Sequence, residues 1–101
     1  MIPYGRQNIT ENDINAVLEV LRSPMLTQGP VVPLFERAVC SAVAAKYGVA
    51  VNSATSALHL ACLALELKSN DILWTVSNSF VASANCGRYC NAEIDFVDIN
   101  P

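Results

Sequence analysis

The chain has 101 residues, of which 52% are hydrophobic and 15% charged, a composition typical of a globular protein of at most one domain. Its net charge is −3, and its six basic residues are scattered, so no basic run or basic–aromatic alternation favours nucleic acid or an anionic membrane. The N-terminus lacks the apolar core of a signal peptide, and no apolar run reaches spanning length, so we expect a cytoplasmic location.

The first part of the chain predicts two helices. Thr10 is the expected N-cap of the first, with Asp13 in the reciprocal position of a capping box and an end near Pro24. An apolar stripe follows the cap at Ile14, Val17, Leu18 and Leu21. After a linker over residues 26–30, a second helix is expected from about Pro33 to about Lys46. Its inward residues would be Leu34, Ala38, Val39 and Ala42.

From Gly48 onward, strand and helix patterns alternate as β-α-β-α-β. The expected elements are a strand over 49–51, a helix over 55–67, a strand over 71–75, a helix reaching Tyr89 and a strand over 93–98. Such alternation implies an α/β fold with a parallel, helix-covered sheet, and it places Trp74 in the core. We therefore expect an N-terminal arm with two helices over residues 1–47 and the start of a sheet domain over residues 48–101.

The sequence stops directly after the last predicted strand, without a helix to cover it. Three strands would leave open sheet edges and apolar surface. We therefore expect the chain to be the front part of a longer polypeptide, or a truncated copy of one.

Four cysteines fall in apolar segments with helical periodicity, namely Cys40, Cys62, Cys86 and Cys90. Cys86 and Cys90 are four residues apart and share a helix face, as a metal-binding pair would. However, the sequence has no Cys-x-x-Cys motif and one histidine, His59, so we expect no metal site. The interpretation is that of buried, reduced cysteines and a packed or partly buried His59.

The turn over Asn52–Ser56 is the clearest candidate for ligand binding. A β-branched run ends in small hydroxyl residues, and an apolar helix begins at once, so several backbone N–H groups point out of the helix N-terminus. Together with the helix dipole they suit a phosphate. The alternative is an ordinary Ser/Thr N-cap that binds nothing.

Phe80 follows the next strand, at the sheet edge where ligands of parallel sheets collect. Its ring can lie against a flat cofactor, or it can close the top of the core. The turn over residues 52–57 contains no glycine, which argues against a nicotinamide or flavin dinucleotide site.

Five runs carry a family resemblance: residues 5–11, 26–30, 52–59, 77–85 and 95–99. In order and spacing they resemble the N-terminal part of the pyridoxal-phosphate-dependent sugar aminotransferases, the DegT/DnrJ/EryC1/StrS family. Within it they look most like the branch that makes pseudaminic acid precursors. The resemblance covers essentially the whole chain.

The resemblance implies the fold-type-I aminotransferase large domain, with pyridoxal 5′-phosphate as cofactor. In such a site Ala54, Thr55 and Ser56 would hold the phosphate, and Phe80 would stack on the pyridine ring. The turn over residues 68–71 and Val76–Ser77 depart from the family pattern, and we expect these two departures to change the loop geometry near Phe80.

The same resemblance implies an activity. The family enzyme would transfer an amino group from glutamate to the C4 keto group of a UDP-4-keto-6-deoxy-N-acetylhexosamine, as a homodimer. The residues that would contact the UDP-sugar are Tyr4, Pro24, Met25, Leu26, Thr27 and Ala54. Met25 departs from the acidic or aromatic residue more common at its position.

The catalytic lysine of this chemistry has no match in the sequence. Lys46 lies at a helix end and Lys68 in a loop, and neither follows a strand at the edge where the cofactor would bind. By the same resemblance, the acid partner of the pyridine nitrogen would belong to a later strand than the one containing Asp95. We therefore expect these 101 residues alone not to transaminate. Two alternatives stay open: a dehydratase of the same family, with histidine in place of the lysine, and a truncated copy without activity.

Overall fold

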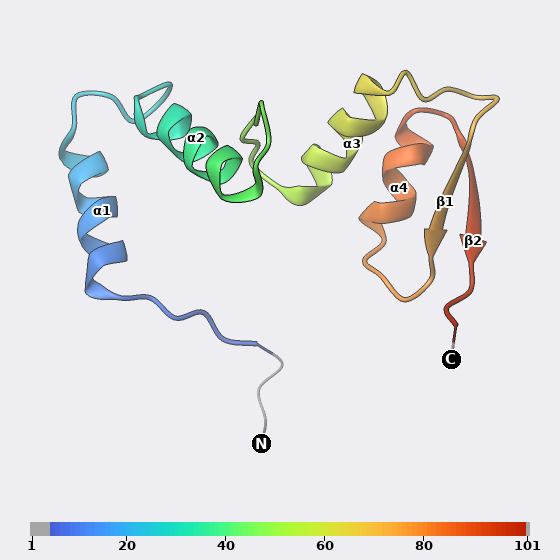
Figure 1. The fold of residues 1–101 in the computed structure, drawn as a ribbon, viewed down its shortest axis with the longest axis horizontal. Coiled ribbons are helices and arrows are strands. Elements are labelled where there is room, and N and C mark those ends of the chain that lie inside the picture. The colour runs from blue at the N-terminus through green and yellow to red at the C-terminus, as the bar shows by residue number, and fades with distance from the viewer. Residues whose placement is uncertain (1–4, 101) are drawn as a thin grey trace. The chain divides into compact units, whose positions relative to one another are not determined.

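The computed structural model describes residues 5–100 and divides the chain into two compact units, Met1–Ala50 and Val51–Pro101. The first unit contains α1 (Glu11–Arg22) and α2 (Val31–Val43). The second contains α3 (Ala54–Ala64), β1 (Ile72–Val76), α4 (Ala82–Tyr89) and β2 (Glu93–Val97), as labelled in Figure 1. No helix among residues 5–100 is long and apolar enough to cross a bilayer.

The predicted capping box at the start of α1 is confirmed. The Thr10 N–H donates to Asp13 Oδ2 at 2.7 Å, and the Asp13 N–H donates to Thr10 Oγ1 at 3.4 Å. These two bonds satisfy backbone donors that the first turn of a helix leaves open. Hydrogen bonds from the Thr10 N–H and hydroxyl stabilise the carboxylate and hold the pKa of Asp13 below its ordinary value of 3.8.

Helix α2 begins at Val31, earlier than predicted, and ends where Ala44 adopts a left-handed conformation with φ 54°. The prediction that Leu34, Ala38, Val39 and Ala42 point inward is wrong, because all four are exposed. The described part of the first unit contains helices and loops and no buried residue. An amphipathic helix buries its apolar stripe only against a second layer, and this unit by itself supplies none.

The predicted strand over residues 49–51 does not form. This segment carries no ladder hydrogen bonds, and Val49 is exposed. Its Ala50 N–H donates to Glu36 Oε1 of α2 at 2.8 Å. A strand needs a neighbour to pair with, and in residues 5–100 β1 and β2 pair with each other. The described order of the second unit is therefore α3-β1-α4-β2.

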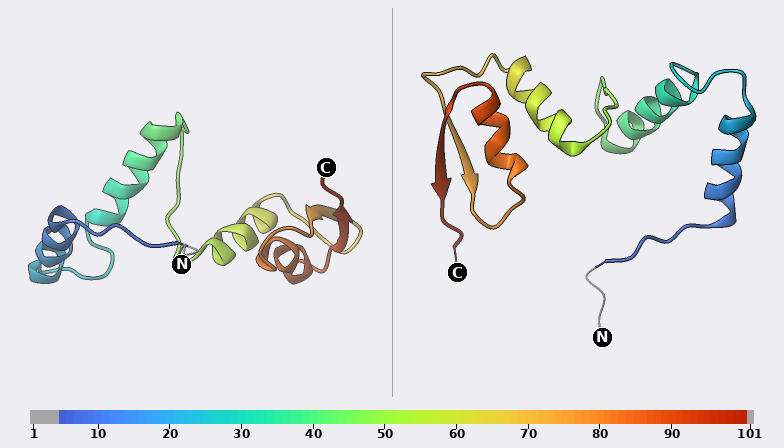
Figure 2. Two further views of the ribbon diagram at one scale, coloured as in Figure 1. Left: turned by 90° about the horizontal axis from the view of Figure 1, so that it is seen from below. Right: turned by 180° about the vertical axis from the view of Figure 1, so that it is seen from behind.

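The strands β1 and β2 are parallel, with Ile72 opposite Glu93 and Val76 opposite Val97, and α4 connects them (Figure 2). One face of the pair packs on α4. A Cβ built on Gly87 of that helix would lie 2.6 Å from Ile94 Cδ1 and 3.0 Å from Leu73 Cδ2, so the helix approaches the sheet closely because Gly87 has no side chain.

Trp74 is not a core residue, contrary to expectation: its side chain is 69% exposed. Alternation along β1 places Leu73 and Thr75 on the half-buried face and Trp74 on the opposite one. No described element of this unit covers that opposite face, so the indole stays in solvent.

The core of the second unit is a cluster of three thiols from α3 and the end of α4. Cys62, Cys86 and Cys90 are 6%, 3% and 8% exposed, and Leu67 and Leu73 pack against them. All four cysteines are free, and Cys40 is half-buried, so the prediction of reduced, buried cysteines holds for the three in this unit. His59 is partly buried, as expected, with its ring edge-on to Tyr89 at 5.1 Å between centroids.

Candidate functional site

The second unit gathers its candidate residues at one end. The N-terminal ends of α3 and α4 and the carboxyl ends of β1 and β2 lie toward the same end of this unit (Figures 1 and 2). Parallel α/β sheets collect ligands at this edge. Ala54, Thr55, Ser56 and Phe80 therefore belong to one end of one unit.

The turn before α3 is held by its own side chains. Ser53 is the N-cap, and its Oγ accepts the Ser56 N–H at 3.2 Å. The Ser56 hydroxyl donates to Asn52 Oδ1 at 2.8 Å, and the Ser53 hydroxyl lies 3.1 Å from the Ser56 hydroxyl. Asn52 therefore orders the turn, a role that the sequence prediction missed. Its signal was an asparagine directly before the N-cap, a position that often bonds to neighbouring backbone and side chains.

This network decides which donors face a ligand. Both the N–H and the hydroxyl proton of Ser56 are engaged within the chain, so Ser56 is less available than predicted. The N–H groups of Ala54 and Thr55 begin the helix, where helix geometry supplies no acceptor. Ala54 is exposed and Thr55 half-buried. The turn thus offers two adjacent N–H groups and the Thr55 hydroxyl to an anion.

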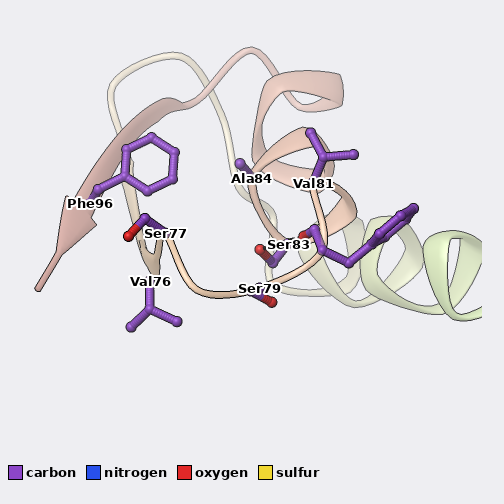
Figure 3. Close-up of a pocket in the computed structure, with 8 residues that line it drawn as sticks. Val76, Ser77, Ser79, Val81, Ser83, Ala84 and Phe96 are labelled. Atoms are coloured by element: carbon purple, nitrogen blue, oxygen red, sulfur yellow. Dashed lines mark hydrogen bonds between the residues drawn. The ribbon is translucent and has the colours of Figure 1, made fainter. Parts of the chain in front are cut away.

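An open groove of about 310 Å³ lies between the β1–α4 loop and β2. Figure 3 shows Phe96 of β2 on one side, Val81 and Ala84 on the other, and residues from the loop between them. Phe80 also lines the groove and is 74% exposed, so the alternative in which it closes the core is wrong. Phe96 is a second aromatic that the sequence prediction missed. Its signal was the alternation of β2, which places it on the same face as Ile94.

The loop that carries Phe80 is fastened at the start of α4. The Ser83 hydroxyl donates to the Phe80 carbonyl oxygen at 2.9 Å and lies 3.1 Å from the Thr75 hydroxyl of β1. Ser83 therefore links the strand, the loop and the helix. This bond fixes the backbone at Phe80 while the ring stays open to solvent.

Four of the residues predicted to contact a sugar follow α1 in the first unit. Pro24, Met25, Leu26 and Thr27 form an exposed turn after α1. The Ser23 hydroxyl lies within 2.7 Å of the Val20 carbonyl oxygen and 3.1 Å of the Met25 carbonyl oxygen. A Cβ on Gly29 would lie 2.9 Å from that Met25 oxygen, so glycine lets this turn close. Of the two other predicted sugar contacts, Ala54 begins α3 in the second unit, and Tyr4 lies outside the described residues.

Within the second unit, Lys68 lies away from the end where the groove opens. Lys68 precedes the amino end of β1, and its N–H donates to Asp71 Oδ2 at 2.9 Å. Lys46 belongs to the first unit, with its Nζ 5.2 Å from the centre of the Tyr47 ring. Within residues 5–100, no group of three His, Cys, Asp or Glu side chains is arranged to hold a metal ion.

Comparison with known proteins identifies the family. The sequence profile of the DegT/DnrJ/EryC1/StrS aminotransferase family matches residues 7–101. The chain therefore belongs to the DegT/DnrJ/EryC1/StrS aminotransferase family, and the resemblance inferred from the sequence motifs is confirmed.

Two similar proteins come from Campylobacter jejuni subsp. jejuni, and each is a UDP-4-amino-4,6-dideoxy-N-acetyl-beta-L-altrosamine transaminase. That of strain 81-176 is 42% identical over 99 residues, and that of strain NCTC 11168 is 39% identical over 99 residues. Each alignment covers 98% of this chain and 26% of the relative.

A solved structure agrees with this assignment. Spr1654 of Streptococcus pneumoniae, assigned as a sugar aminotransferase and solved in its PLP form, matches with a TM-score of 0.91 and 32% identity. The match covers 98% of this chain and 25% of Spr1654. The chain thus spans about a quarter of the length of the relatives it matches.

Proposed function

We propose that this chain supplies the phosphate-binding and ring-binding part of the pyridoxal 5′-phosphate site of a nucleotide-sugar aminotransferase. The proposal rests on one observation. The same end of the second unit carries the open backbone N–H groups of Ala54 and Thr55 and the exposed ring of Phe80, which lines a groove. Family membership independently supports the same cofactor.

The residues present fit the phosphate group. Two adjacent N–H groups at a helix N-terminus, with a hydroxyl beside them, match the several acceptor oxygens of a phosphate monoester. Ala54 has a methyl side chain, which allows an anion to approach the backbone. Ser53 and Asn52 hold the turn in the required shape through the bonds described above.

The groove fits a flat ring beside that phosphate. The Phe80 ring is exposed, and the hydrogen bond from Ser83 already holds the backbone at Phe80. A pyridine ring can therefore stack on Phe80 without first having to order this loop. When bound, pyridoxal phosphate acts as the electron sink for the chemistry at the amino-bearing carbon. In this chain, Phe80 would orient the ring and exclude water from one of its faces.

We further propose the substrate class from the relatives. Both Campylobacter proteins named above are transaminases of a UDP-linked 4-amino-4,6-dideoxy sugar, at about 40% identity. By this proposal the full enzyme transfers an amino group, with glutamate as donor, to the C4 keto group of a UDP-4-keto-6-deoxy-N-acetylhexosamine in pseudaminic acid biosynthesis. Residues 24–27, Ala54 and Tyr4 would contact the UDP-sugar, and the full enzyme would be a homodimer.

The proposal places the Schiff-base lysine and the acid partner of the pyridine nitrogen outside these 101 residues. It is tested by mixing the chain with one equivalent of pyridoxal phosphate and reducing with borohydride. We expect reversible binding and no cofactor fixed to Lys46 or Lys68. Stoichiometric fixation to either lysine would contradict this division of the site.

The activity is tested with the full-length gene product and a panel of UDP-4-ketosugars, with glutamate as donor. Amino transfer to a UDP-4-keto-6-deoxy-N-acetylhexosamine is the expected result. Loss of water from the sugar without amino transfer would replace the proposal by the dehydratase alternative. A full-length product that neither binds the cofactor nor converts any of the sugars would support the remaining alternative, a copy without activity.

A further inference from the structure

The hydroxyl of Thr75 belongs to a chain of hydrogen bonds that ends at the backbone of Phe80. The Ser83 hydroxyl donates its one proton to the Phe80 carbonyl oxygen at 2.9 Å. Its oxygen can therefore only accept in the bond to Thr75, so the Thr75 hydroxyl is the donor there, at 3.1 Å. Because linked hydrogen bonds polarise one another, this donation strengthens the bond that Ser83 makes to Phe80. The two hydroxyls thus form one directed chain from β1 to the loop before α4.

This chain of hydroxyls starts from a fixed point and holds a loop that has little other support. Thr75 is half-buried in β1 and lies opposite Phe96 of β2 in the parallel pair. The loop over residues 77–80 is exposed, and α4 begins at Val81 without a side-chain cap. In the described part of the chain, the side-chain hydrogen bond that holds this loop is the one from Ser83. The strand therefore positions the loop through Thr75 and Ser83.

The position of the Phe80 ring depends on this backbone. The ring is 74% exposed, so packing against other side chains does little to fix it. The Phe80 carbonyl oxygen accepts from both the hydroxyl and the N–H of Ser83, at 2.9 Å and 3.0 Å. Two bonds to one carbonyl oxygen orient the peptide group next to the Phe80 Cα, and a rotation of this group would move the whole ring.

We infer that Thr75 is a positioning residue for the cofactor ring, because through Ser83 it holds the backbone at Phe80 in the orientation in which the ring stacks. The inference rests on the proposed function, in which Phe80 binds the pyridine ring of pyridoxal 5′-phosphate. It adds that this contact depends on a hydroxyl of β1 that itself makes no contact with the cofactor. Thr75 therefore influences ring binding through Phe80 and takes no part in binding the phosphate.

A double-mutant cycle separates positioning from a general effect on stability. Thr75→Val keeps the β-branched shape, which suits a strand, and removes the hydroxyl. Its effect on the binding of pyridoxamine 5′-phosphate is measured by titration calorimetry in the original chain and in Phe80→Ala. In the original chain we expect the dissociation constant to rise by about twofold to tenfold, the range that stacking itself contributes. In Phe80→Ala we expect no further rise, because the contact that Thr75 positions is already lost.

A second measurement follows the loop without the cofactor. Thr75→Val should lower the ¹⁵N order parameters of the amides of residues 77–80, whereas the other amides of the second unit should keep theirs. Thr75→Ser keeps the hydroxyl and should restore both the order parameters and the affinity. Ser83→Ala breaks the same chain of bonds at its second member, so it carries the same cycle if Thr75→Val unfolds. Ser69→Ala is the matched control, because it removes an exposed hydroxyl in the turn before β1 and should change neither quantity.

The results distinguish this inference from the proposed function. If pyridoxamine 5′-phosphate does not bind, or if Phe80→Ala binds it with unchanged affinity, the ring-binding part of the proposed function fails and the inference fails with it. If Phe80→Ala weakens binding and Thr75→Val does not, the inference alone is overturned. It is also overturned if Thr75→Val weakens binding equally in both backgrounds, which would indicate a merely structural role, or if the order parameters of the loop stay unchanged.

Discussion

The Ser53 hydroxyl oxygen accepts a hydrogen bond from the backbone N–H of Ser56 at 3.2 Å. This bond satisfies one donor in the first turn of α3 and leaves the two preceding N–H groups open. Those two groups belong to Ala54 and Thr55. A helix without this cap would present a looser turn to an anion, whereas here the shape of the turn is set before any ligand arrives. The bond therefore distinguishes residues that hold the turn from those that face the phosphate.

Replacement of Thr55 should weaken cofactor binding more than replacement of Ser56. Thr55→Val keeps the side-chain shape but removes a hydroxyl that would bond a charged phosphate, a loss of roughly 1.5–3 kcal/mol, or about tenfold or more in affinity. Ser56→Ala removes a hydroxyl already given to Asn52 and should cost less. Titration calorimetry with pyridoxamine 5′-phosphate measures both, and equal losses would contradict the separation of roles.

Phe80→Ala should weaken binding of the cofactor ring without affecting the fold. The side chain is largely exposed, so its truncation removes little packing, whereas stacking on a bound ring is worth about 0.5–1.5 kcal/mol beyond the area buried. Phe80→Trp should restore or improve affinity. Both variants should keep the circular dichroism spectrum of the original chain, and a Phe80→Ala variant with unchanged affinity would remove Phe80 from the site.

Gly87→Ala should destabilise the second unit by about 1–3 kcal/mol. The new methyl group would clash with Ile94 and Leu73, and these side chains would have to move to make room for it. Gly5→Ala is the matched control, since a Cβ there has nothing within 4 Å. Urea unfolding followed by the amide NMR signals of β1 and α4 measures the difference. Equal midpoints for the two variants would show that α4 does not pack on the sheet as closely as described.

The N-terminus of α1 should loosen in acid. The hydrogen bonds from Thr10 lower the pKa of Asp13 in the folded chain. The ionised carboxylate therefore stabilises the folded state fully above pH 3.8, the ordinary pKa. This stabilisation is lost as the pH falls through the lower pKa of the folded state. Carboxyl and amide NMR shifts of Asp13 and Thr10, followed from pH 6 to pH 2, should titrate together. Thr10→Ala removes the hydroxyl bond but keeps the backbone N–H bond, which lowers the pKa of Asp13 most, so that pKa should move only part of the way back toward 3.8. A full return to 3.8 in that variant would contradict the backbone bond as the main cause.

Local signals predicted this fold better than signals that depend on neighbours. The capping box of Thr10 and Asp13 lies within four residues, so the sequence contains all that determines it. Strands β1 and β2 were predicted within one residue at each end because β-branched and aromatic runs between turns are local too. The strand over 49–51 and the burial of Trp74 both need a covering or pairing element, and residues 5–100 contain none for them.

The candidate site was predictable in position but not in detail. The turn over Asn52–Ser56 and the location of Phe80 follow from strand ends and a helix start. That Ser56 bonds to Asn52, and that Phe96 shares the groove with Phe80, depends on side-chain geometry and on the register of β2. Sequence periodicity predicts which face a residue occupies, but not which hydroxyl proton is already engaged.

The central claim is that the N-terminus of α3 holds the phosphate of the cofactor. The most direct test is an amide NMR titration of the ¹⁵N-labelled 101-residue chain with pyridoxamine 5′-phosphate and, separately, with pyridoxamine, which has the same ring without the phosphate. We predict saturable shifts that are largest at the amides of Ala54 and Thr55, with a smaller response near Phe80, and at least tenfold weaker binding of pyridoxamine. Equal binding of the two compounds, or largest shifts away from this turn, would contradict the claim.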